Sequence, residues 1–282
     1  MKKFGMLLLM FVAAGVQATA ILPQSVTLES GNLKVRLDGR KFCFMNRIEW
    51  NNKMFCVDNP SFHYGTVFKI VGANGFVGSG NIETGHKEQV QSLTILVDGK
   101  LVDYLKADAF KGAKIQVIKV SQMRNFLVKY ELTLIDNQIA ERLEVTSDAD
   151  VKLDKMYHFM HPWSTAFTDL FYRKVNGSEE TFVFRTDGKF PLREDAPIVA
   201  WYNRKTGDGV VTVVFPGEGQ KNRIRLVWDT KRYRKDHIVD FRNSTFPKGH
   251  KAVYAVKTAF FSQPDVEKWI DDAKAIAAQL EK

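Results

Sequence analysis

Three consecutive stretches of alternating apolar and polar residues constrain the fold of this chain more than any other feature. They cover residues 126–135, 139–146 and 151–161, and they are separated by Asp136-Asn137 and by Asp148-Ala149-Asp150. Alternation with a period of two is typical of a strand that is buried on one face. Short polar turns between such strands indicate antiparallel neighbours. The sequence therefore predicts a meander of three long strands, as in a wide β-sandwich.

Most of the remaining chain also has the pattern of strands. Before the meander we expect strands at residues 26–29, 33–37, 42–50, 54–57, 66–71, 89–97, 101–105 and 114–121. After it we expect strands at residues 181–185, 197–202, 209–215, 224–228, 237–241 and 252–261. The glycine-rich residues 72–87 predict a long loop. Residues 264–281 predict a helix, because Pro264 suits a first turn and apolar residues then recur three or four apart.

The N-terminal segment, residues 1–20, has the pattern of a secretory signal peptide. Lys2 and Lys3 precede an apolar run over residues 7–16, and Ala18-Thr19-Ala20 fits a small-x-small cleavage site. The apolar run is shorter than the roughly 20 residues that a membrane span needs. No later stretch of the sequence is long and apolar enough to span a membrane. We therefore expect a secreted or periplasmic protein with one domain over residues 21–282.

The net charge narrows the expected partners, and the cysteine content bears on whether a disulfide forms. The chain carries a formal net charge of +9 at pH 7. A basic exported protein favours acidic partners, and an anionic polysaccharide fits better than nucleic acid because no dense block of lysine and arginine is present. Cys43 and Cys56 are the two cysteines of the sequence. They leave open either a disulfide or two buried thiols.

A stretch of aromatic and histidine side chains ends the third meander strand. Tyr157, His158, His161 and Trp163 lie within eight residues. Strict alternation would place Tyr157 and His161 on one face and His158 on the other, unless a bulge intervenes. We therefore expect His158 in the core and Tyr157 with His161 at a site, with Trp163 as a platform for a sugar ring.

The glycine-rich loop carries a second candidate group. Glycines allow a backbone to approach a ligand closely, and His86 is a candidate general acid or base that Glu83 or Glu88 orients. The segment is neither a P-loop nor a dinucleotide fingerprint, because a strand pattern follows it instead of a helix.

The third candidate segment, residues 228–237, is the densest basic cluster. It combines Trp228 and Tyr233 with Arg234 and Lys235. Arginine forms bidentate contacts with carboxylates, and tyrosine offers a ring face and a phenol. A solvated basic loop is the alternative interpretation of this segment.

These features together resemble the galactose-mutarotase-like supersandwich group. The long meandering strands, the glycine-rich loop with His86 and the late segment with Trp228 and Tyr233-Arg234-Lys235 carry the resemblance, which spans most of the chain. The group includes aldose epimerases and the β-sandwich domains of several polysaccharide lyases. The resemblance implies an all-β fold, namely a large two-sheet antiparallel β-sandwich with a C-terminal α-helix. For an epimerase it implies an acid and a base drawn from His86, His161 and Glu83.

Two classes of function follow from these residues, namely an enzyme acting on carbohydrate and a carbohydrate-binding module. A polysaccharide lyase would cleave a uronate-containing polysaccharide by β-elimination, with histidine and tyrosine moving protons and a cation offsetting the carboxylate. An aldose 1-epimerase, or a non-catalytic carbohydrate-binding module, is the alternative. We expect the lyase, without a metal or a cofactor. The residues expected in catalysis are His86, His161, Tyr233 and Arg234, and those expected to bind substrate are Glu83, Tyr157, Trp163, Trp228 and Lys235.

Overall fold

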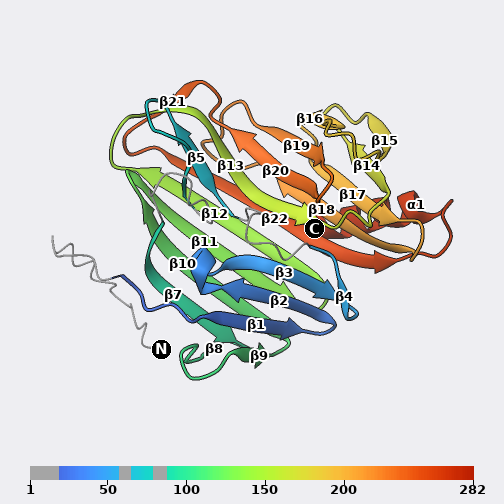
Figure 1. The fold of residues 1–282 in the computed structure, drawn as a ribbon, viewed down its shortest axis with the longest axis horizontal. Coiled ribbons are helices and arrows are strands. Elements are labelled where there is room, and N and C mark those ends of the chain that lie inside the picture. Colours follow the sequence, from blue (N-terminus) through green and yellow to red (C-terminus); the bar gives the residue numbers. More distant parts are fainter. Residues whose placement is uncertain (1–18, 57–64, 79–87) are drawn as a thin grey trace, which may run out of the picture.

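The computed structural model describes residues 19–56, 65–78 and 88–282. Three sheets form two layers (Figure 1). A ten-stranded sheet is covered on one face by a five-stranded sheet and a seven-stranded sheet, and the single helix α1 packs on its other face. The predicted all-β sandwich with a C-terminal helix is confirmed.

The ten-stranded sheet contains the predicted meander. All of its neighbouring strands are antiparallel. In order across the sheet they are β15 (Glu179–Val183), β14 (Asp169–Arg173), β17 (Ile198–Asn203), β18 (Asp208–Phe215), β22 (Lys251–Ser262), β12 (Gln138–Ser147), β11 (Phe126–Ile135), β10 (Lys114–Met123), β7 (Gln89–Val97) and β8 (Lys100–Leu101). The third meander strand, β13, leaves this sheet and joins the opposite layer.

The five-stranded sheet is N-terminal. Its order is β4 (Lys53–Met54), β3 (Phe44–Trp50), β2 (Leu33–Asp38), β1 (Ser25–Ser30) and β9 (Ala109–Lys111), with the short 3-10 helix η1 (Gly39–Lys41) between β2 and β3. β9 pairs with β1 in parallel, whereas the other pairs are antiparallel. The hairpin between β3 and β4 turns at Asn51 and Asn52, both of which have positive φ, as expected for this turn.

The seven-stranded sheet is built around β13. Its order is β16 (Leu192–Glu194), β19 (Ile224–Asp229), β20 (Arg234–Asp240), β13 (Val151–Trp163), β5 (Val67–Ile70) and β6 (Val77–Gly78), and β21 (Ser244–Phe246) pairs with β13. β13 and β20 run side by side in the upper half of Figure 1. Because β13 is central to this sheet, its side chains point either into the sandwich or out of it.

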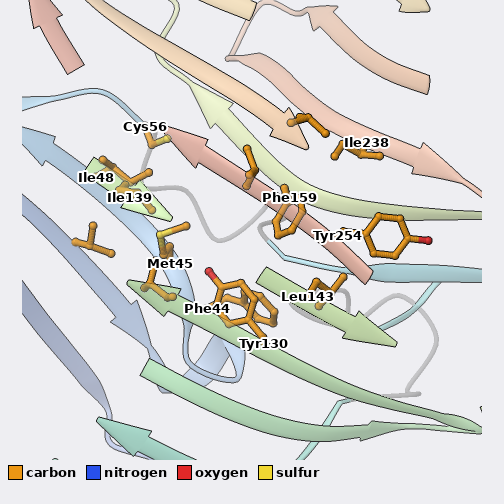
Figure 2. Close-up of a cluster of buried hydrophobic side chains, with 14 of the residues drawn as sticks. Phe44, Met45, Ile48, Cys56, Tyr130, Ile139, Leu143, Phe159, Ile238 and Tyr254 are labelled. Atoms are coloured by element: carbon orange, nitrogen blue, oxygen red, sulfur yellow. The ribbon is translucent and has the colours of Figure 1, made fainter. Parts of the chain in front are cut away.

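The core fills the space between the two layers. Figure 2 shows side chains of all three sheets meeting there, and the labelled residues are Phe44, Met45, Ile48, Cys56, Tyr130, Ile139, Leu143, Phe159, Ile238 and Tyr254. The rings of Phe44 and Tyr130 lie 4.7 Å apart between their centroids. Cys43 and Cys56 are both buried free thiols, so of the two states that the sequence left open the structure has the thiols and not the disulfide. Burial raises the pKa of the Cys43 thiol to about 11.

Helix α1 (Trp269–Leu280) begins five residues later than the predicted start at residue 264. A turn closed by the Lys268 amide on the Asp265 carbonyl separates it from β22. Its buried residues are Trp269, Ala273, Ala277 and Leu280. The Trp269 ring stacks on the Tyr202 ring at 4.9 Å. The apolar stripe of the sequence therefore packs on the outer face of β17, β18 and β22.

Several short elements differ from the sequence pattern. The strand expected at residues 101–105 is limited to β8, and β6 lies inside the predicted glycine-rich loop. β9, β14, β16 and β21 are additional strands of three to five residues, too short for alternation to reveal. The expected signal peptide lies almost wholly outside the described residues. Within the described ranges, no helix has the length and hydropathy needed to cross a membrane.

Candidate functional site

A β-bulge in β13 decides which side chains face the interior. His158 pairs with Ile238 of β20, and His161 pairs with Asp236. The chain therefore advances three residues along β13 where it advances two along β20. Phe159 takes up the extra residue with φ of 46°, in the left-handed region. His158 and His161 therefore lie on the same, inner face, and Tyr157 lies on the outer face. The prediction that Tyr157 and His161 share a face is wrong, because it assumed a regular strand.

His161 belongs to a buried polar chain between the layers. Its Nε2 lies 2.8 Å from Oε2 of Glu141, and the Tyr130 hydroxyl donates to the other oxygen of Glu141 at 2.8 Å. Burial and the Glu141 carboxylate raise the pKa of Tyr130 well above its ordinary value. Trp163 is fully buried, with its ring 5.3 Å from that of His161. Both side chains face the interior between the layers and not the outer face of the seven-stranded sheet.

His158 is a core residue, as expected. Its ring lies 4.0 Å from the Tyr254 ring, and neither ring nitrogen has a hydrogen-bond partner among the described residues. Burial lowers the pKa of His158 to about 3. The imidazole is therefore neutral at pH 7 and packs as an aromatic side chain.

The basic cluster of residues 228–237 is divided by strand alternation. Arg234 points inward, is 4% exposed, and forms an ion pair with Asp229. Its guanidinium also lies 4.7 Å from the Phe184 ring centroid. Asp236 likewise faces inward and holds Arg225 through two hydrogen bonds. Arg234 is thus engaged inside the protein and does not present its guanidinium to a uronate carboxylate.

The outer face of the seven-stranded sheet brings together Tyr157, His237 and Phe76. The Tyr157 ring meets the His237 ring edge to face at 4.9 Å, and Phe76 lies 5.3 Å from Tyr157 on its other side. The Lys155 ammonium lies 5.9 Å from the Tyr157 ring centroid, and Lys69 lies 5.6 Å from that of Phe76. Tyr157 is half-buried, and its hydroxyl makes no hydrogen bond within the described parts of the chain. We call Tyr157 and His237 the outer-face pair.

His237 is poised as a neutral base. It is 4% exposed, and its Nδ1 has no hydrogen-bond partner within the described ranges. Burial, and then the positive charge of Lys235, lower its pKa well below the ordinary value. Sequence reasoning did not select His237. The sequence did contain a sign of its position, because strand alternation places residues 235, 237 and 239 on the face opposite Arg234 and Asp236.

An aromatic and basic strip continues from the outer-face pair. Trp228 of β19 is paired with Lys235 of β20, and its indole N–H donates to the Gly188 carbonyl at 2.8 Å. Phe190 stacks on Trp228 at 5.4 Å with an interplanar angle of 13°, and Tyr233 meets Trp228 edge on at 6.5 Å. Trp228, Tyr233 and Lys235, chosen from sequence, thus lie together as one surface, the aromatic–basic strip.

His161 and Tyr233, both expected in catalysis, do not lie together. His161 faces the interior, whereas Tyr233 lies against Trp228 on the outer face. His86 and Glu83 lie outside the described residues. Among the residues that the structure describes, no group of three or more histidine, cysteine, aspartate or glutamate side chains is arranged to hold a metal ion.

Comparisons with known proteins show the fold. No protein-family model and no curated protein sequence matches this chain. A galactose mutarotase-like protein from Clostridium acetobutylicum superimposes with a TM-score of 0.51 at 9% identity, over 85% of this chain and 95% of that one. The Slr1438 protein from Synechocystis sp. PCC 6803 gives 0.50 at 8% identity, over 89% and 100% of the two chains. The galactosidase domain of an alpha-galactosidase-sucrose kinase gives 0.55 at 10% identity, over 87% of this chain and 42% of that one. The chain therefore has a galactose-mutarotase-like β-sandwich fold, as the sequence predicted.

Proposed function

We propose that this protein binds a sugar on the outer face of its seven-stranded sheet and acts as an aldose 1-epimerase. The observation that carries the proposal is the outer-face pair, which sets a buried, neutral imidazole against a half-buried phenol on the outer face of the sheet. The name of the similar Clostridium acetobutylicum protein is consistent with this chemistry. The lyase interpretation, expected first, is supported less well, because its proposed cation Arg234 is held by Asp229.

Anomeric exchange needs only a base and an acid. His237 takes the proton from the hydroxyl at C1, while Tyr157 gives its proton to the ring oxygen. The bond between C1 and the ring oxygen then breaks, and the open-chain aldehyde forms. Rotation about the bond between C1 and C2 presents the other face of the carbonyl. Ring closure reverses both proton transfers, so the protein returns to its starting state and the sugar gains the opposite anomeric configuration.

The surroundings favour these two roles. An imidazole must be unprotonated to act as a base, and the burial and positive neighbour of His237 keep it so at pH 7. The Lys155 ammonium near the Tyr157 ring adds positive charge beside the phenolate that forms when Tyr157 gives up its proton. The aromatic faces of Phe76 and Tyr157 provide apolar surface against which a sugar ring can pack.

Polarimetry tests the proposal directly. Freshly dissolved α-anomers of galactose, glucose and a uronic acid are followed with wild type and with the variants Tyr157→Phe and His237→Gln. We expect wild type to speed equilibration, and each variant to lose roughly 10²–10⁴-fold of that acceleration, the usual contribution of a general acid or base. Tyr104→Phe removes a half-buried phenol elsewhere and serves as the matched control.

The outcomes separate the functions. No acceleration by folded wild type on any sugar would refute the epimerase and leave the binding module. An unchanged rate in Tyr157→Phe and His237→Gln would refute the assigned residues. A rise in ultraviolet absorbance on a uronate polymer would instead support the lyase. Because His237 is buried, circular dichroism of each variant accompanies the assay, and the half-buried Tyr157 gives the cleaner test.

A further inference from the structure

Strand alternation places every acidic side chain of β19 and β20 on the inner face of the sheet. All three aspartates of these strands point inward. Asp229 holds Arg234, Asp236 holds Arg225, and Asp240 accepts from the Tyr254 hydroxyl at 2.7 Å. The outward positions carry no acidic side chain and include Lys235 and His237. The inner charges are therefore balanced inside the protein, and no acidic side chain of these two strands faces outward.

Three cations gather at the aromatic end of this face. Arg193 of β16 lies with its guanidinium 5.8 Å from the Phe190 ring centroid. Lys231 and Arg232 are exposed in the turn between β19 and β20. None of these three forms an ion pair with an acid of the described residues. The ring pair of Phe190 and Trp228 thus has Arg193 beside it, and Lys231 and Arg232 lie in the turn that follows β19.

The ring of Trp228 lies beyond the reach of a sugar ring held over Tyr157. Tyr157 pairs with Val239, and Trp228 pairs with Lys235. Four residues of β20 separate these positions, or about 13 Å along the strand. A single sugar ring over Tyr157 cannot also stack on Trp228, although His237 and Lys235 are only two residues of β20, or about 7 Å, apart. A second or third unit of the same chain, extended along the sheet, reaches the ring pair.

We propose that the aromatic–basic strip binds the distal units of an acidic, uronate-containing oligosaccharide whose reducing end lies at the outer-face pair. This substrate class rests on the proposed function. The apolar face of one uronate ring stacks on Phe190 and Trp228. Its carboxylate, which projects from the ring edge, meets the guanidinium fork of Arg193 and the charges of Lys231 and Arg232. The excess of uncompensated cations makes a neutral glycan the poorer ligand.

Calorimetry with defined oligosaccharides tests this substrate class. The ligands are a galacturonate tetramer, a neutral galactose tetramer, a sulfated glycan and a single-stranded oligonucleotide. We expect the uronate tetramer to bind at least tenfold more tightly than the neutral one. Arg193→Gln and Trp228→Ala should each weaken uronate binding by about tenfold, the first by removing a hydrogen bond to a charged group and the second by removing a stacking ring. Lys106→Gln removes an exposed lysine far along the sequence and is the matched control.

Each outcome decides the inference. Equal affinity for neutral and uronate tetramers, or full affinity in Arg193→Gln and Trp228→Ala, overturns it. Tighter binding of the sulfated glycan or the oligonucleotide overturns the carboxylate assignment. Wild type that binds the uronate tetramer without epimerising any sugar contradicts the proposed function alone. Wild type that epimerises neutral monosaccharides but shows no preference for the uronate tetramer contradicts the strip proposal alone.

Discussion

Replacing His158 with phenylalanine should remove a defined part of the acid sensitivity of this fold. The imidazole is buried against Tyr254 without a hydrogen-bond partner in the described chain, and its pKa is about 3. An unfolded histidine titrates near 6.5. Between these two values the unfolded chain binds a proton that the folded protein does not, so the wild-type free energy of unfolding falls as the pH falls.

The size of the effect follows from linkage. Each pH unit below about 6.5 costs about 1.4 kcal/mol per buried neutral histidine. At pH 5.0 His158 therefore lowers the wild-type free energy of unfolding by about 2 kcal/mol relative to pH 7.5. His158→Phe keeps a ring of similar size and abolishes this proton uptake. The variant should gain about 2 kcal/mol over wild type between pH 7.5 and pH 5.0.

Urea denaturation at pH 7.5, 6.0 and 5.0 measures this difference. Other titrating groups act equally in both proteins and cancel in the comparison. Met156→Leu, at the neighbouring inward position of β13, is the control, because a volume-conserving change without a titrating group should give a difference that does not vary with pH. A difference between His158→Phe and wild type that stays constant from pH 7.5 to pH 5.0 would refute the reasoning.

Two further changes test the packing. Glu141→Ala should lower the free energy of unfolding by about 1–3 kcal/mol for each of the two groups that it leaves unpaired, Tyr130 and His161. Glu141→Gln keeps an acceptor and should cost clearly less in urea denaturation, and equal losses would contradict the buried chain. Gly65→Ala and Gly188→Ala both add a Cβ at positive φ, 87° and 78°, but only at Gly65 does that atom fall 2.7 Å from a buried phenylalanine ring. Gly65→Ala should therefore be less stable than Gly188→Ala by about 1–3 kcal/mol, and equal melting curves would show that the ring moves aside freely.

The sequence pattern identified four residues of the proposed site and its surroundings and missed one. Tyr157, Trp228, Tyr233 and Lys235 were selected from their types and do lie together on the outer face. His237 was missed, because its suitability as a base depends on its burial and on the Tyr157 ring beside it. Neither is visible in the sequence.

The sequence by itself determined the long strands and the class of fold. Period-two alternation and polar turns depend only on neighbouring residues, so the meander strand β11 was predicted to the residue. The tertiary structure alone decided which way the last meander strand faces. The extra residue at Phe159 reverses the alternation, and it is stabilised by the core that surrounds its ring. One unpaired residue therefore turned His161 toward Glu141 in the interior and left Tyr157 with His237 outside, because side-chain direction follows the register of the hydrogen-bonded ladder.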